Sequence, residues 1–129
     1  GAKYGTGAAE QDFIELRLAD VILLYAEALN ENTDTPAART AALAQLNKVR
    51  TRVSLVNSTA STQAAVRTAI ANERRLELAL EGQRFFDLVR TGTLDAAMGK
   101  TISSNYHVFP LPTSEIFASG EVITQNAGY

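Results

Sequence analysis

Three glutamates spaced four residues apart are the first candidates for chemistry in this sequence. Glu73, Glu77 and Glu81 would share one stripe of a helix, with Cβ atoms about 5–6 Å apart. Retaining glycosidases hold their two carboxyl groups at a similar separation, roughly 5–5.5 Å. However, side chains on one helix stripe point the same way, whereas the catalytic pair of a glycosidase must flank the sugar from different directions.

Arginines close to these glutamates argue further against catalysis. A guanidinium group keeps a neighbouring carboxylate ionised, and an ionised carboxylate cannot act as a general acid. Glutamates four residues apart also repel one another, so the stripe requires cations. Arg74, Arg84 and Arg90 are the local candidates, and Arg50 and Arg52 are the distant ones. We therefore predict no catalytic residue and a structural ion-pair network that clamps helices together. The predicted members of this network are Glu73, Arg74, Glu77, Glu81, Arg84, Asp87 and Arg90.

Metal and cofactor sites lack their usual residues here. His107 is the only histidine and the chain has no cysteine, so a metal site would need carboxylates from distant parts of the chain. The segment Gly5-x-Gly7 lacks the strand, the helix and the third glycine of a dinucleotide site. No arrangement of serine, histidine and aspartate follows from spacing either. We expect neither a metal nor a cofactor.

Aromatic side chains are candidates for contact with a sugar, because sugars stack on aromatic faces. Phe85 and Phe86 lie inside the charged stretch, where core packing is the natural interpretation. The remaining candidates for a sugar platform are Tyr106, Phe109 and Tyr129. Packing in the core or in the C-terminal tail is the alternative interpretation for each of these three.

Size and charge limit the classes of protein. The chain has 129 residues and a net charge of −2, which suits one domain and gives no support for nucleic-acid binding. No apolar run is long enough to span a membrane. We expect a single domain over residues 1–129, with a flexible Gly-rich segment at residues 1–12.

The hydrophobic periodicity predicts an all-α fold. A helix over residues 17–31 is apolar on nearly all sides, which is typical of a buried central helix that would be largely exposed in this chain alone. Thr35 and Pro36 begin a second helix that reaches about Arg52. The two helices resemble one tetratricopeptide unit. A long third helix from Thr62 ends at Gly82 after Glu81, a short fourth helix runs from 84 to 91, and an irregular C-terminal tail follows.

Smaller features of the C-terminal part are also predicted. Residues 94–98 are expected to form one further helical turn stopped by Gly99, and residues 100–112 to be irregular or extended. Thr113 is expected to cap a short helix. Val122, Ile123 and Tyr129 are expected to fold back onto the body of the domain.

The charged stretch carries a family resemblance. It reads Glu73-Arg74-Arg75-x-Glu77-Leu78-Ala79-x-Glu81-Gly82-x-Arg84-Phe85-Phe86-Asp87-Leu88-x-Arg90-x-Gly92, and this resembles the signature of the SusD/RagB family. The helix 17–30, the segment 44–52, the Pro110-Leu111-Pro112-x-x-Glu115-Ile116 segment and the ending 124–129 resemble other parts of that family in the same order. The resemblance covers residue 13 to the end, and corresponds to the C-terminal portion of a family member.

The resemblance implies a binding protein rather than an enzyme. Family members are nutrient-binding lipoproteins of the Bacteroidetes outer membrane, which capture glycans for polysaccharide utilisation and pass them to a SusC-like TonB-dependent transporter. The implied partners are this transporter, a glycan and the remaining N-terminal portion of the same protein. This segment would act as helical scaffold. Because it carries neither a signal peptide nor a lipid-accepting cysteine, we expect it to be a piece of the lipoprotein.

Two other functions remain open from sequence. A family member could capture peptides or other nutrients with the same scaffold. Alternatively, a free-standing tetratricopeptide-like module could bind only protein. Neither the ligand nor the residues that contact it follow from the sequence.

Overall fold

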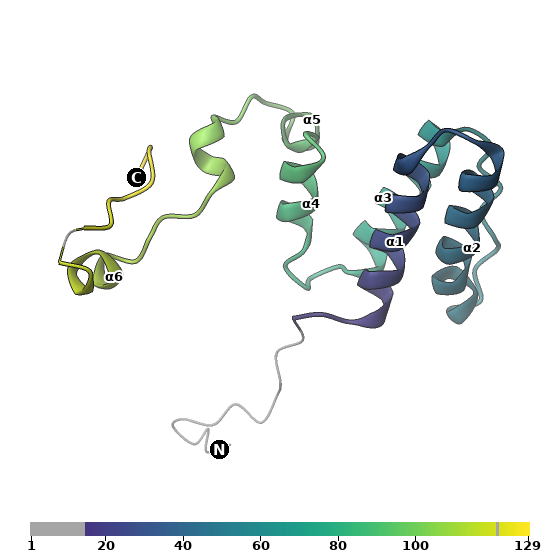
Figure 1. Cartoon of the computed structure of the whole chain (residues 1–129), viewed down its shortest axis with the longest axis horizontal. Coiled ribbons are helices and arrows are strands. Elements are labelled where there is room, and N and C mark those ends of the chain that lie inside the picture. The colour runs from purple at the N-terminus through teal and green to yellow at the C-terminus, as the bar shows by residue number, and fades with distance from the viewer. Residues whose placement is uncertain (1–14, 121) are drawn as a thin grey trace, which may run out of the picture. The chain divides into compact units, whose positions relative to one another are not determined.

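The computed structural model describes residues 15–120 and 122–129, which form helices and connecting segments without a strand (Figure 1). The segment 1–12, predicted to be flexible, lies outside the described residues. The chain divides into two compact units, one that ends at Gly82 and one that begins at Gln83. The all-α prediction is confirmed.

Two helices form the predicted hairpin of the first unit. Helix α1 spans Leu18–Asn32 and α2 spans Pro36–Arg52. Thr35 caps α2 as predicted, because its side-chain oxygen accepts a hydrogen bond from the Ala38 N–H at 3.2 Å. Helix α3, Gln63–Glu77, packs against both and is capped in the same way by Thr62 (Figure 1).

One apolar core joins the three helices. Its fully or almost fully buried members are Leu23, Ala26, Ala42, Leu46, Val49, Val66 and Ile70. At one end of this core, Asn30 is also fully buried and exchanges hydrogen bonds with Gln63: the Asn30 amide donates to the Gln63 carbonyl at 3.1 Å, and the Gln63 amide donates to the Asn30 carbonyl at 2.7 Å. The pair fixes the start of α3 against the end of α1.

The prediction that much of the apolar first helix is exposed in this chain alone is confirmed. Leu23 and Ala26 face the core, while Leu18, Val21 and Tyr25 lie on an opposite stripe that is exposed. Helix α1 therefore carries apolar side chains both in the core and on the surface of this chain.

Helix α3 ends earlier than predicted. We expected it to reach Gly82, but it ends at Glu77, and Leu80 adopts a left-handed backbone with φ of 66°. In a longer helix the Glu77 carbonyl would accept from the Glu81 N–H; instead it accepts from the Arg17 guanidinium, and the Glu81 N–H donates to Leu78 at 3.2 Å. The Arg17 side chain, at the start of α1, therefore occupies the Glu77 carbonyl that would accept the next hydrogen bond of a longer α3.

The second unit consists of short elements. Helices α4, Arg84–Arg90, and α5, Leu94–Met98, are followed by a 3-10 turn, η1, Ser104–His107, and by α6, Thr113–Ala118. Gly99 ends α5 in a left-handed conformation as predicted. Two smaller predictions were wrong: a 3-10 turn interrupts the segment expected to be irregular, and Thr113 is the first residue of α6 instead of its cap.

The C-terminal tail is attached through side-chain hydrogen bonds to backbone. Gln125 accepts from the Leu111 N–H at 2.7 Å and donates to the Leu111 carbonyl at 2.9 Å. The Tyr129 hydroxyl donates to the Val108 carbonyl at 2.9 Å. Val122 remains exposed, contrary to the prediction that it folds back onto the body.

Candidate functional site

The end of α3 is the centre of an ion-pair cluster, which we call the α3 clamp: Arg17, Arg50, Arg52, Glu73, Glu77 and Glu81. Arg17 contacts Glu77 at 2.7 Å through Nη1 and Glu81 at 2.7 Å through Nε, and its Nη2 donates to Glu81 at 2.8 Å. The planar fork of arginine suits this geometry because it can bond two carboxylates at once. Arg17 thus ties the start of α1 to the turn after α3.

The other two arginines of the α3 clamp come from the end of α2. Arg50 donates to Glu73 at 2.6 Å, and Arg52 donates to both oxygens of Glu77 at 2.7 and 2.8 Å. The Glu73 and Glu77 side chains are almost buried, 4% and 9% exposed, whereas Arg52, the partner of Glu77, is 58% exposed. The pair of Arg50 and Glu73 is therefore screened by salt less than the pair of Arg52 and Glu77. The cluster therefore joins all three helices at one end of the first unit.

Neighbouring charges determine the protonation states of Glu77 and Arg17 in the α3 clamp. Burial raises the pKa of Glu77, but the hydrogen bond from Arg17 and the charge of Arg52 outweigh burial, and the pKa is lowered overall. Hydrogen bonds to Glu81 and Glu77 raise the pKa of Arg17 above its usual value. Glu77 is consequently ionised at neutral pH and accepts hydrogen bonds; it is not poised to donate a proton.

Arg74 lies apart from the clamp and pairs with α1. Its Nη1 donates to the Asp20 carboxylate at 2.7 Å, and both side chains are buried. The same nitrogen lies 3.3 Å from the Asp20 carbonyl. This buried pair links the last turn of α3 to the first turn of α1.

The remaining predicted network residues belong to the second unit. Asp87 and Arg90 form an ion pair at 2.8 Å within α4, while Arg84 is exposed at the start of that helix. Among the predicted network residues, Glu73, Glu77 and Glu81 thus belong to the α3 clamp, Arg74 pairs with Asp20, and Asp87 pairs with Arg90.

Arg17 of the α3 clamp and Asp20, the partner of Arg74, are ion-pair residues that the sequence analysis did not assign to the network. Both belong to the polar stripe of an otherwise apolar helix, which was the signal available for them. A single sequence cannot pair them, because Arg17 and Glu81 are 64 positions apart in the chain.

The predicted aromatic candidates form two groups in the second unit. Tyr106 and Tyr129 meet edge to face with ring centroids 5.6 Å apart, and each is about half exposed. Phe109 packs beside Phe85 and Phe86 with centroid distances of 5.3 and 6.1 Å. Phe109 and Phe86 remain 60% and 55% exposed, so an aromatic surface stays open to solvent.

His107 has no metal-binding companions in the described residues. Across residues 15–120 and 122–129, no three histidine, aspartate or glutamate side chains come together to hold an ion. The His107 Nε2 is buried without a hydrogen-bond partner there. Among the described helices, none combines the length and hydrophobicity needed to cross a bilayer.

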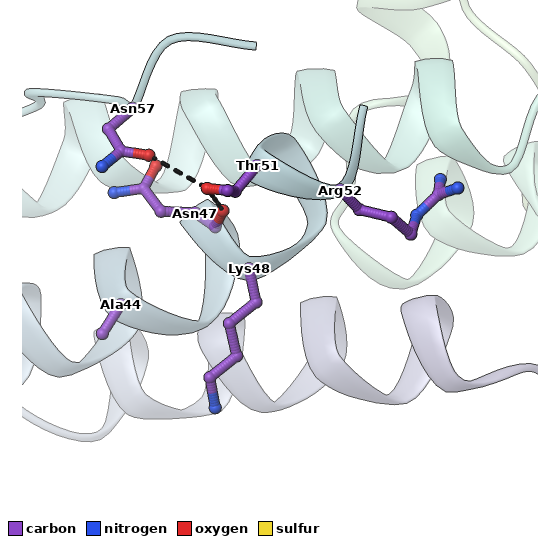
Figure 2. Close-up of a pocket in the computed structure, with 6 residues that line it drawn as sticks. All are labelled: Ala44, Asn47, Lys48, Thr51, Arg52 and Asn57. Carbon is purple, nitrogen blue, oxygen red and sulfur yellow. Dashed lines mark hydrogen bonds between the residues drawn. The ribbon is translucent and has the colours of Figure 1, made fainter. Parts of the chain in front are cut away.

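A wide, open hollow of about 550 Å³ lies along the C-terminal half of α2 (Figure 2). We call it the α2 hollow, and its lining residues are Ala44, Asn47, Lys48, Thr51, Arg52 and Asn57. The Thr51 hydroxyl donates its single hydrogen to the Asn47 carbonyl at 2.7 Å, and the Asn57 side-chain oxygen lies 3.4 Å from the same hydroxyl (Figure 2). This hollow could not be predicted from the sequence, because Asn57 reaches it only when the segment after α2 folds back.

Comparison with known proteins gives a consistent set of relatives. The family model of the SusD family matches residues 1–105. Among curated proteins, SusD-like protein P2 of Formosa agariphila is 28% identical over 92% of this chain, and SusD-like protein P38 of the same organism is 36% identical over 70%. The aligned regions are 26% and 19% of those two proteins, so this chain spans about a quarter of the length of its curated relatives or less.

Solved structures agree with this set. A laminarin-binding SusD-like protein is 40% identical with a TM-score of 0.69, over 92% of this chain and 23% of that one. Surface glycan-binding protein A from Bacteroides thetaiotaomicron is 31% identical with a TM-score of 0.64, over 84% of this chain and 23% of that one. A SusD-like protein from Bacteroides fragilis is 29% identical with a TM-score of 0.67, over 91% and 26%.

Proposed function

The chain belongs to the SusD family, and from this membership we propose that it takes part in the capture of glycans at the outer surface of the cell, without chemical change to them. The observation that carries the proposal is the 40% identity to a laminarin-binding SusD-like protein over most of this chain. The likeness to a surface glycan-binding protein supports the same class of ligand.

Within such a protein, the first unit is proposed to act as a rigid scaffold. Its three helices share one core, and the α3 clamp fixes their common end. The exposed stripe of α1, formed by Leu18, Val21 and Tyr25, would pack against another part of a longer SusD-like protein. Delivery of the glycan to a SusC-like TonB-dependent transporter, and location at the outer membrane as a lipoprotein, are part of the same proposal.

The absence of catalysis is also proposed, and the state of the α3 clamp supports it. Glycoside hydrolysis needs one carboxyl group that stays protonated near neutral pH. Glu77 has the opposite property, since Arg17 and Arg52 lower its pKa. Glu73 is held by a hydrogen bond from Arg50 at 2.6 Å.

Tyr106, Phe109 and Tyr129 are proposed as the residues of this segment that contact sugar. Tyr106 and Tyr129 are about half exposed and Phe109 is 60% exposed, and aromatic faces stack on sugar rings through apolar contact. The edge-to-face pair of Tyr106 and Tyr129 would present one ring face beside one ring edge.

Affinity electrophoresis tests the proposal. The 129-residue chain and the full-length gene product would migrate through native gels that contain laminarin or one of a panel of plant, host and microbial polysaccharides. We expect at least one glycan to retard both proteins, and Tyr106→Ala and Phe109→Ala to reduce retardation of the short chain. Glu115→Ala, an exposed change outside the aromatic groups, is the control. Retardation of the full-length product alone would locate the contacts elsewhere, and retardation of neither would refute glycan capture.

The exposed stripe of α1 favours protein binding as a second candidate function. A tetratricopeptide-like module could use Leu18, Val21 and Tyr25 to hold a partner helix. Such an adaptor should be monodisperse by light scattering, whereas a scaffold segment with an uncovered face should self-associate. Serine at these three positions should abolish self-association if the face is responsible. Capture of peptides or other nutrients would appear as binding without retardation by any glycan.

A further inference from the structure

The turn after α3, residues 78–82, has the sequence of a continued helix. Ala79, Leu80 and Glu81 all have side chains that favour helix. Gly82 already has a left-handed backbone, with φ of 79°, which is the usual conformation of the residue that follows a helix. A helix that continued through Glu81 would therefore end at Gly82 without a change at the glycine itself.

The backbone of Leu80 is what separates the observed turn from that longer helix. Its φ of 66° is left-handed, which is unfavourable for a residue with a Cβ atom. The Leu80 side chain is fully exposed, so packing within the described part of the chain does not compensate for this strain. Hydrogen bonds must therefore hold the turn in its observed form.

Arg17 supplies these hydrogen bonds. Its Nη2 donates to the Glu77 carbonyl, which in a longer helix would accept from the Glu81 N–H. The same guanidinium also reaches both carboxylates: Nη1 donates to Glu77, and Nε and Nη2 donate to Glu81, at 2.7, 2.7 and 2.8 Å. One planar group thus occupies the carbonyl and holds the side chain of the residue that would have to move.

We propose that residues 78–82 form a two-state helix end controlled by Arg17. With Arg17 bound to the Glu77 carbonyl, α3 ends at Glu77 and Leu80 is strained. When Arg17 withdraws, the Glu81 N–H donates to the released carbonyl, Leu80 becomes helical and α3 gains about one turn. Arg17 directly precedes α1, so a partner that displaces this segment would lengthen α3. The device is independent of glycan capture.

The variant Arg17→Gln tests this switch in the 129-residue chain. It lacks the guanidinium that occupies the Glu77 carbonyl, while Arg52 still pairs with the Glu77 carboxylate. We expect the Cα chemical shifts of residues 79–81, measured by NMR, to move toward helical values. Hydrogen exchange of the Glu81 amide should slow about two- to tenfold, as expected for the gain of one regular hydrogen bond.

Arg52→Gln is the matched control, because Arg52 also bonds to Glu77 but only through the carboxylate oxygens. It should leave the chemical shifts of residues 79–81 as they are in the parent chain. The double variant Arg17→Gln/Leu80→Gly should return these residues to the short form, since glycine accepts a left-handed φ and disfavours helix. Unchanged shifts in Arg17→Gln, or equal changes in Arg52→Gln, would overturn the proposal.

A second pair of variants decides the question if Arg17→Gln does not fold. Leu80→Gly in the parent chain relieves the left-handed strain without loss of packing, so it should raise the urea midpoint. Leu76→Gly makes the same change at an exposed position inside α3 and should lower the midpoint. A lower midpoint in both variants would show that Leu80 is not strained, and the two-state helix end would be refuted.

Discussion

In the first unit, three helices bury a shared set of aliphatic side chains, whereas the second unit buries Leu88 and Leu94 and leaves Phe86, Phe109 and Phe117 exposed. The first unit has tertiary contacts between helices and buried ion pairs. The second depends on local turns and on side-chain hydrogen bonds from the tail. We therefore expect the first unit, which ends at Gly82, to contribute most of the free energy of unfolding. Apolar surface that is available for other contacts lies in the second unit and along α1.

The buried pair of Arg74 and Asp20 offers the largest test of this difference. Arg74→Met should destabilise the first unit by about 3–5 kcal/mol, because it leaves the Asp20 carboxylate buried without its cation. Urea unfolding followed by circular dichroism measures the loss. The double change Asp20→Leu/Arg74→Met removes both charges and should recover most of the stability. A single variant as stable as the parent chain would show that Asp20 is hydrated instead of paired.

Matched apolar truncations compare the two units directly. Leu46 is fully buried and Leu46→Ala should cost about 2–5 kcal/mol, since it removes packing and leaves a cavity. Phe117 is 67% exposed, so Phe117→Ala should change the free energy of unfolding by less than about 0.5 kcal/mol. The same urea titration measures both. Similar losses in the two variants would contradict the placement of the core in the first unit.

Acid should weaken the first unit through Glu77. Its folded-state pKa is lowered, so its stabilising contribution is complete above the unfolded-state pKa of about 4.3 and is lost as pH falls through the lower folded value. Glu77→Gln should be less stable than the parent chain at pH 7 and should lose less stability between pH 5 and pH 3. If the free energy of unfolding of the two chains varied with pH in the same way, Glu77 would not contribute to the stability of the α3 clamp.

The second unit should respond to loss of tail hydrogen bonds. Gln125→Ala removes the contacts with both backbone groups of Leu111, each worth about 0.5–1.5 kcal/mol. Amide hydrogen exchange should accelerate at Leu111 and stay unchanged in α1. Thr124→Ala, an exposed change next to it with no such contact, is the control. Faster exchange in α1 would show that the tail also stabilises the first unit.

The elements of the fold could be predicted where local chemistry decides them. Thr35 with Pro36 specifies the start of α2, and the 3.6-residue periodicity of Leu43, Leu46 and Val49 specifies its apolar face. The end of α3 could not be predicted in this way. Nothing near Glu77 in sequence breaks a helix; the competing hydrogen bond comes from Arg17, which is distant in the chain.

The candidate site follows the same division. The type and spacing of Glu73 and Glu77 indicated that arginines must accompany them, and Arg50 and Arg52 were among the candidates. The α2 hollow had no sequence signal, because Asn47 and Asn57 belong to a helix and a loop that meet only after folding. Contacts between residues close in sequence can be predicted from the sequence. Residues that come together only in the folded structure can be recognised in the sequence only as polar positions without an assigned partner.

The smallest expected effect concerns the exposed pair of Glu31 and Arg67, joined at 2.5 Å on the surface of the first unit. The hydrogen bond from Arg67 lowers the pKa of Glu31, so the contribution of Glu31 is present above its unfolded-state pKa and is lost in acid. Glu31→Gln should leave the urea midpoint unchanged within error at 0.15 M NaCl and lower it slightly at 0.01 M, where charges are screened less. Asn32→Ala serves as the exposed control. A large loss at both salt concentrations would mean that surface pairs contribute as much as the core to the first unit, and the contrast between its interior and its surface would have to be abandoned.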